Sequence, residues 1–294
     1  MKLADSTDRF IQERRILNNV SPATIQWYRY SLRALQPVLE AGFESIGLFK
    51  AAVIKRIDEL QIQGRGNKAV SINTYLRCLK AFMQWCFQEG IVREPFKLAW
   101  LIEEEKILAT FSQLHVKQLV HWKPVTRSDS RLHTLTLTAL DTGIRVAELL
   151  NLSRDDVDFQ NFTLRVRGKG NKHRLVPISI ELRKALYRHL AKHERPLVFC
   201  TVQGRQLSKR NLLRDFKELC SRLGISGVRC SFHTLRHTFS VGYLRNGGNL
   251  FYLSKILGHT SVKTTERYLQ SLGIEDLQAV HNRLSPLSSR QALG

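Results

Sequence analysis

The N-terminal part of the chain carries apolar residues every three or four positions, which is the spacing of amphipathic helices. A Ser-Pro pair supplies an N-cap and a first helical residue for the first segment, and glycines close the segments. The predicted helices cover residues 21–42, 47–64 and 71–90. Residues 1–95 are therefore predicted to form a small all-helical domain.

The pattern changes after residue 95. A proline, an acidic run and a new capping pattern follow one another in "REPFKLAWLIEEEKILATFS", and an interdomain linker is predicted at 96–110. Beyond it, a helix ending at "DTG" and a short helix in "IRVAELLNL" lead into residues 156–179. Apolar and polar residues alternate there between turn signals, which predicts a small antiparallel sheet.

Helical spacing returns after the predicted sheet and continues to about residue 285. Residues 111–285 are predicted to form a second domain that combines helices with the small sheet. Residues 286–294 are predicted to be a flexible tail. The predicted fold class is mainly α, with an all-helical first domain and an α+β second domain.

Composition adds a strong positive charge to this picture. The chain has 46 lysines and arginines against 25 acidic residues, which gives a formal net charge of +21. Such an excess favours a polyanionic partner. No apolar run reaches the roughly 18 to 20 residues that cross a bilayer, and the N-terminus lacks a signal-peptide pattern. No membrane association is predicted, and a cytoplasmic location is expected.

The motifs disfavour metal and nucleotide chemistry. His233 and His237 stand four apart, but Arg236 between them cannot ligate a metal and the glutamate of H-E-x-x-H is missing. Five cysteines without a C-x-x-C pair are interpreted as small buried hydrophobic residues. The segment "GKGNK" lacks the spacing of a phosphate-binding P-loop. No metal, ATP or other cofactor is predicted.

Several cationic and imidazole side chains stand where predicted helices or hairpins turn. Each has a plain structural alternative: an arginine pairs with a nearby carboxylate such as Glu148, a hairpin lysine is hydrated, and a helical tyrosine lies in the core. Singly, they identify no activity. These candidates are Arg145 in "TGIRVAEL", Lys169 in "VRGKGNK", His233 and Arg236 in "HTLRH", His259 in "LGH" and Tyr268 in "TTERYL".

The order of these motifs resembles the tyrosine recombinase (phage integrase) family across nearly the whole chain. The segments "TGIRVAELLNL", "GKGNKHRLVPI", "HTLRHTF" and "LGHTSVKTTERYL" carry the resemblance, and "SPATIQWYRYSLRAL" stands where the family has its core-binding domain. The resemblance implies a SAM-like helical core-binding domain and a catalytic domain of the DNA breaking-rejoining fold. The segment before Ser21 is too short for an additional arm-binding domain, so the compact Xer-like two-domain layout is expected.

The same resemblance implies roles for the candidate residues. The implied catalytic set is Arg145, Lys169, His233, Arg236, His259 and the nucleophile Tyr268, with Glu148 in support. Two guanidinium groups match the non-bridging oxygens of a phosphodiester. A tyrosine, with a pKa of about 10, needs its proton accepted; His233 is the predicted acceptor and His259 a predicted donor to the phosphate. Lys169 is the predicted general acid, with Lys172 as the neighbouring alternative. His237 is predicted to support the site or to lie in the core.

By this resemblance the chain is expected to be a site-specific recombinase. It would cleave double-stranded DNA through a 3′-phosphotyrosyl intermediate and exchange strands through a Holliday junction. A homo-tetramer of two dimers, accessory DNA-bending proteins, an association with the nucleoid and docking of helix 274–284 onto a neighbouring copy are implied. Two alternatives stay open: a type IB topoisomerase-like nicking and resealing enzyme, and a DNA-binding regulator without catalysis.

Overall fold

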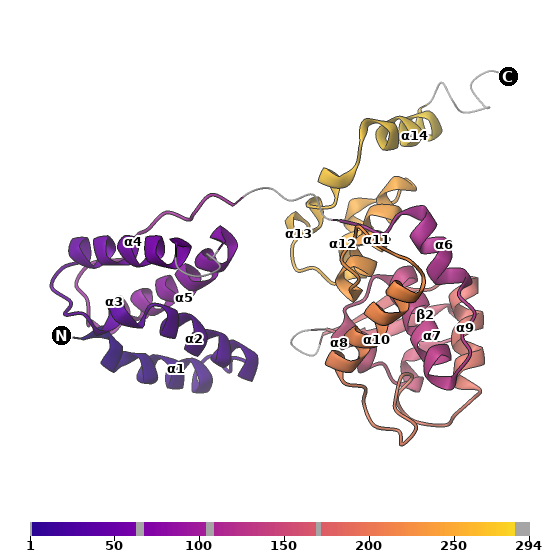
Figure 1. Cartoon of the computed structure of the whole chain (residues 1–294), viewed down its shortest axis with the longest axis horizontal. Coiled ribbons are helices and arrows are strands. Elements are labelled where there is room, and N and C mark those ends of the chain that lie inside the picture. Colours follow the sequence, from indigo (N-terminus) through magenta and orange to yellow (C-terminus); the bar gives the residue numbers. More distant parts are fainter. Residues whose placement is uncertain (1, 63–67, 104–108, 169–171, 286–294) are drawn as a thin grey trace. The chain divides into compact units, whose positions relative to one another are not determined.

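The computed structural model of the chain describes residues 2–62, 68–103, 109–168 and 172–285. The chain divides into two compact units, residues 1–105 and residues 106–294. Helices dominate both units, and the described part of the second unit contains a three-stranded antiparallel sheet (Figure 1). The predicted fold class, mainly α with a small antiparallel sheet, is confirmed.

The first unit is built around α5 (Ala69–Gln88), ten of whose residues are buried. Phe10 and Phe82, both fully buried, pack edge to face with ring centroids 5.4 Å apart at the centre of this core. Residues 96–101 also pack partly against the first unit through Phe96, Leu98 and Leu101. The other helical elements are η1 (Leu3–Ser6), α1 (Thr7–Ile16), α2 (Pro22–Ala34), α3 (Gln36–Glu40) and α4 (Ile46–Ile62).

The single helix predicted over residues 21–42 is wrong in one respect, because the structure divides it into α2 and α3. The start agrees with the prediction: the Ser21 hydroxyl accepts a hydrogen bond from a backbone N–H three residues on, and Pro22 is the first helical residue. The division falls at Leu35, whose φ of −102° and ψ of 5° depart from helix geometry. Pro37 lies two residues beyond, and its ring removes an N–H donor and clashes with the preceding turn.

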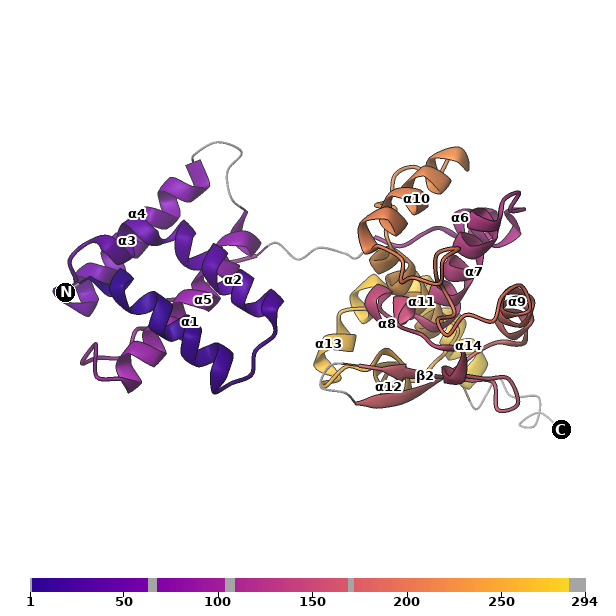
Figure 2. The same ribbon diagram turned by 90° about the horizontal axis from the view of Figure 1, so that it is seen from below.

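The second unit has α7 (Arg127–Thr142) and α11 (Phe232–Arg245) packed together in its interior. Leu135 of α7 and Leu235 of α11 are fully buried in its core. Figure 2 shows α10 and the sheet on opposite sides of this core. The other helical elements are α6 (Gln113–His121), α8 (Val146–Leu150), η2 (Arg154–Asp156), α9 (Ile180–Leu190), α10 (Lys209–Arg222), α12 (Leu250–Leu257), α13 (Lys263–Glu266), η4 (Leu269–Ser271) and α14 (Ile274–Leu284).

The sheet follows the alternating pattern of the sequence. Its antiparallel strands are ordered β1, β2, β3, and Leu164 of β2 faces Val176 of β3, with both side chains fully buried. The Gly168 N–H donates to the Lys172 carbonyl (2.8 Å) where the β2–β3 hairpin closes. The strands are β1 (Val157–Asp158), β2 (Thr163–Arg167) and β3 (His173–Pro177).

Two helices of the second unit end at glycines in the left-handed conformation. The C-cap of α7 is Gly143 with a φ of 60°, and the C-cap of α12 is Gly258 with a φ of 64°. A side chain with a Cβ is strained at such angles, so glycine suits both positions. Arg145 follows the first of these glycines by two residues, and His259 follows the second directly.

Candidate active site

The turn between α7 and α8 holds Arg145. This residue is the N-cap of α8, and its backbone N–H donates to Oε2 of Glu148 in the first turn of that helix (2.8 Å). Its Nη1 also donates to Glu148 Oε1 at 3.2 Å. The Arg145 side chain nevertheless remains 41% exposed. Its charge is therefore accessible to a ligand from solvent.

Arg236 reaches the same turn from α11, and it is 4% exposed. Its Nη1 donates to the Gly143 carbonyl (2.6 Å), and its Nη2 donates to the Leu257 carbonyl (2.9 Å). Burial and the nearby charge of Arg145 lower the pKa of Arg236 to about 10. The guanidinium therefore remains a cation at neutral pH.

His259 lies against Arg236. The Nη2 of Arg236 is 2.9 Å from Nε2 of the imidazole, and Nδ1 is 2.8 Å from the Thr265 hydroxyl. An arginine can only donate, so Nε2 accepts and the ring proton on Nδ1 points to Thr265. Burial, followed by the positive charges of Arg236 and Arg145, lowers the pKa of His259 to about 4. The imidazole is therefore neutral at physiological pH.

Tyr268 lies between α13 and η4, within reach of these groups. It is 2% exposed, and its ring lies parallel to that of His259 with centroids 6.5 Å apart. The ring centroid of His237 lies 5.7 Å from that of Tyr268. The Tyr268 N–H donates to the Thr265 carbonyl (3.0 Å), so the turn that carries the tyrosine also carries the partner of His259.

Arg174 of β3 completes the cluster, although the sequence analysis did not identify it. Its Nη1 and Nη2 donate to the two carboxylate oxygens of Glu148 at 3.0 and 2.8 Å. Its Nε donates to the Ile256 carbonyl at the end of α12 (2.7 Å). The one available signal was its position within "GKGNKHRLVPI", two residues after Lys172 and five after Lys169.

The balance of charge in this cluster is positive. Burial raises the pKa of Glu148, but hydrogen bonds from Arg174 and from the Arg145 backbone outweigh burial and hold that pKa below its usual value. The carboxylate is therefore ionised, and it faces the guanidinium groups of Arg145 and Arg174, with Arg236 adjacent. Three cations around one described anion leave an excess of two positive charges, which suits a phosphate ligand.

Two of the residues predicted from sequence stand apart from these contacts. His233 is exposed in the first turn of α11. Partial desolvation of its ring, followed by the positive charges of Lys209 and Arg236, lowers its pKa. The ring contacts of Tyr268 in the described residues are with His237 and His259 rather than with His233. Lys169 lies outside the described residues.

His237 also contacts this cluster. Its ring packs on Tyr268, and burial together with the charge of Arg267 lowers its pKa to about 4. The imidazole is thus neutral beside the tyrosine.

Among the residues that the structure describes, no group of three or more His, Cys, Asp or Glu side chains is arranged to hold a metal ion. The five cysteines are free thiols, four of them buried.

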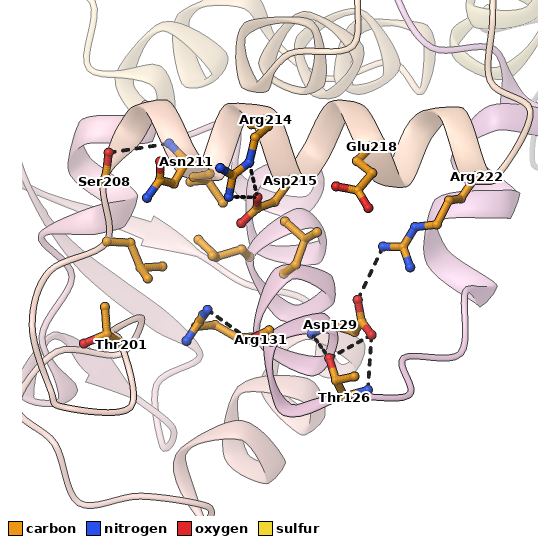
Figure 3. Close-up of a pocket in the computed structure, with 15 residues that line it drawn as sticks. Thr126, Asp129, Arg131, Thr201, Ser208, Asn211, Arg214, Asp215, Glu218 and Arg222 are labelled. Atoms are coloured by element: carbon orange, nitrogen blue, oxygen red, sulfur yellow. Dashed lines mark hydrogen bonds and ion pairs between the residues drawn. The ribbon is translucent and has the colours of Figure 1, made fainter.

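A separate cleft of about 410 Å³ lies between α7 and α10 (Figure 3). Its charged groups are largely paired with one another: Arg222 with Asp129 (3.4 Å) and Arg214 with Asp215 (3.0 Å). The described side chains that line it include no histidine, cysteine or tyrosine. It therefore offers no tyrosine or cysteine nucleophile and no imidazole base, and the Arg145–Tyr268 cluster is the candidate active site.

Known proteins resemble this chain over most of its length. Residues 110–273 match the family model described as the phage integrase family. The tyrosine recombinase XerA of Thermococcus onnurineus is 30% identical over 258 residues, which cover 86% of each chain. The tyrosine recombinase XerC of Thermodesulfovibrio yellowstonii is 26% identical and covers 88% of this chain and 91% of its own.

Solved structures share the fold. A crystal structure of a XerA recombinase is 25% identical, with a TM-score of 0.53 over 96% of this chain and 99% of its own. The Tn1549 transposon integrase in complex with transposon right end DNA is 19% identical, with a TM-score of 0.76 over 97% and 100%. The chain belongs to the phage integrase family. It is a site-specific tyrosine recombinase, and its enzyme class is that of the DNA strand transferases.

Proposed function

We propose that this recombinase cleaves duplex DNA with Tyr268 and stores the bond energy in a 3′-phosphotyrosyl link. The observation that carries this assignment is the position of Tyr268 beside Arg236 and His259, in a cluster with an excess of positive charge. Homologous structures contain DNA: XerH is bound to its difH substrate and lambda integrase to a core site. The first unit is assigned the role of the core-binding domain.

The arginines stabilise the phosphate. The described side-chain hydrogen bonds of Arg145, to Glu148 and to the Leu257 carbonyl, are both donated by Nη1. Its exposed guanidinium can turn its other N–H groups toward a non-bridging oxygen. Arg236 keeps its charge despite burial. A pentacoordinate transition state carries more charge on these oxygens than the ground state does, so fixed guanidinium groups lower the barrier.

Tyr268 must become accessible before it attacks. At 2% exposure, its hydroxyl can meet a DNA phosphate only if the α13–η4 segment shifts. Once it is exposed, the proposed proton acceptor is His233, which is neutral at physiological pH because its pKa is lowered. His237, packed on the tyrosine ring, supports the nucleophile from behind.

The departing 5′ oxygen requires a proton. Lys169 is the proposed general acid because it stands in the sequence between Gly168 and Lys172, whose backbone hydrogen bond closes the β2–β3 hairpin. Lys172 is the alternative, and its side chain is exposed. His259 is proposed to bind the phosphate through Nε2, which requires that nitrogen to gain a proton when DNA arrives.

The proposed assembly is a homo-tetramer of two dimers that exchanges strands through a Holliday junction. Helix α14 supports this: it has no buried residue, and Ile274, Leu277 and Leu284 are 69, 53 and 71% exposed. We assign this apolar surface to docking on a neighbouring copy.

Accessory DNA-bending proteins and a cytoplasmic, nucleoid-associated location belong to the same proposal. In the described part of the chain, no helix is long and apolar enough to cross a membrane.

The test is covalent trapping on a nicked DNA duplex that carries the recombination site. Cleavage releases a short fragment from such a substrate, so the tyrosyl adduct accumulates. Wild-type protein should form a denaturation-resistant adduct without added metal, and Tyr268→Phe should bind the DNA without forming one. An adduct that persists in Tyr268→Phe would remove this residue as the nucleophile. Resolution of a synthetic Holliday junction then separates recombination from a topoisomerase-like activity.

A further inference from the structure

We propose that Arg174 is a positioning residue that neutralises Glu148 and thereby leaves the charge of Arg145 for the scissile phosphate. This inference rests on the proposed function. Arg174 would not touch the DNA itself, because its guanidinium is occupied by Glu148 and by the Ile256 carbonyl.

Glu148 is shared unequally by its two arginines. Arg174 binds it through two parallel hydrogen bonds of 3.0 and 2.8 Å, and the two side chains are 14% and 7% exposed. Arg145 reaches the same carboxylate through one side-chain hydrogen bond of 3.2 Å and remains 41% exposed. A buried bidentate pair is stronger than an exposed single contact. The negative charge is therefore compensated mainly by Arg174.

Without Arg174, Arg145 would be the cation that remains hydrogen-bonded to Glu148 among the described residues. A carboxylate without its bidentate partner would draw Arg145 toward itself and cancel its charge. The arginine that faces solvent would then be neutralised within the protein before DNA arrives. With Arg174 present, the Arg145–Glu148–Arg174 group keeps one net positive charge for the phosphate.

Arg174 also connects α8 to the end of α12. It lies on β3, two residues after Lys172, and its Nε donates to the Ile256 carbonyl at the end of α12. Gly258 rests on the guanidinium so closely that a Cβ there would lie 2.9 Å from the Arg174 Cζ. One partly buried side chain thus contacts Glu148 in α8 and the turn before His259.

The experiment measures single-turnover adduct formation on the nicked duplex at saturating DNA. The proteins are wild type, Arg174→Met, Glu148→Gln and the double variant. Arg174→Met should be about 10- to 100-fold slower, as is usual for a group that orients a catalytic residue. The double variant should recover most of this loss, because removal of the carboxylate charge releases Arg145 again. A double variant that is as slow as Arg174→Met, or slower, would overturn the proposal.

A second substrate separates charge from structure. A methylphosphonate at the scissile position has lost the negative charge of one non-bridging oxygen, so it depends less on cations in the transition state. The defect of Arg174→Met should shrink on this substrate, whereas a residue that merely maintains the fold would slow both substrates equally. Arg165→Met, which removes the exposed Arg165–Asp156 ion pair (3.0 Å) of the neighbouring strand, is the matched control and should be slowed on neither.

Circular dichroism is recorded for every variant at the assay temperature, so that rates refer to folded protein. If Arg174→Met formed adducts as fast as wild type, only the positioning role would be contradicted. Absence of any adduct in the wild-type protein bound to DNA would instead contradict the proposed function, and the inference would fall with it. The two failures are therefore distinguishable.

Discussion

The Nη2 atom of Arg236 lies 2.9 Å from Nε2 of His259, and this contact determines which nitrogen of the imidazole carries the proton. Because the arginine can only donate, Nε2 accepts and Nδ1–H donates to the Thr265 hydroxyl 2.8 Å away. As long as Nδ1–H is donated to Thr265, His259 can donate to a phosphate through Nε2 only if the ring gains a second proton, on Nε2. DNA binding and the protonation of His259 are therefore expected to be linked.

Binding of DNA should accordingly take up a proton. The pKa of His259 in the free protein is about 4, since burial and the charges of Arg236 and Arg145 disfavour the imidazolium. A bound phosphate raises that pKa, so proton uptake is expected at a pH between the free and bound values, for example near pH 6. Calorimetric binding heats in two buffers of different ionisation enthalpy measure this uptake. His259→Gln should reduce it and His121→Gln, on an exposed helix end, should not; equal heats in both buffers would contradict the linkage.

Thr265 should control the reactivity of His259. Its side chain is fully buried, and its hydroxyl holds Nδ1. Thr265→Val preserves the shape and removes the acceptor, so adduct formation should slow by about 10- to 100-fold, the usual cost of losing such an orienting partner. Thr265→Ser keeps the hydroxyl and should stay close to wild type. A valine variant as fast as the serine variant would show that the ring needs no such partner.

Stability should fall in mild acid because of a histidine remote from the active site. His189 is 6% exposed, donates to the Val198 carbonyl (2.9 Å), and burial lowers its pKa to about 4. The unfolded histidine, with a pKa of about 6.5, binds a proton before the folded one does. This contribution to stability is complete above pH 6.5 and is lost as the pH falls toward 4, on the order of 2 kcal/mol.

Denaturant unfolding at pH 7 and pH 4.5 tests this dependence against His189→Gln, whose amide can still donate to the carbonyl. The variant should lose less stability than wild type between the two pH values. Carboxylates such as Glu148 and Asp129, whose pKa values are lowered in the folded protein, also weaken the fold in acid. They are common to both proteins, so the difference between them isolates the histidine. Identical losses would assign the whole acid effect to the carboxylates.

Lys169 and Lys172 can be separated chemically. A general acid protonates the departing 5′ oxygen, so its removal should slow cleavage by about 10²- to 10⁴-fold. A 5′ sulfur leaves as a stable thiolate and needs no proton, so the variant of the true general acid recovers on that substrate. We expect recovery for Lys169→Ala and none for Arg236→Ala, which loses charge stabilisation on both substrates. Recovery of Lys172→Ala instead would transfer the role to that residue, and recovery of neither would contradict a lysine acid.

Local signals in the sequence were sufficient for much of the fold. Ser21 and Pro22 predicted the start of α2, and the alternation around "FTLRVR" and "RLVPI" predicted the strands β2 and β3. Pro37 carried the signal that divides α2 from α3, but the apolar spacing on both sides was continuous and masked it. Such features act within a few residues, which is why a sequence displays them.

The sequence by itself also determined the family and its candidate residues, because motif order and spacing are properties of the linear chain. Tertiary structure alone decided the pairing of Arg174, one of 46 cationic residues, with Glu148, and the contact of Thr265 with His259. Arg145 and Leu257, which meet through a hydrogen bond, are separated by 112 positions. Contacts of this range exist only once the hydrophobic core has brought the two turns together, and no local pattern of residues encodes which nitrogen or which guanidinium remains free.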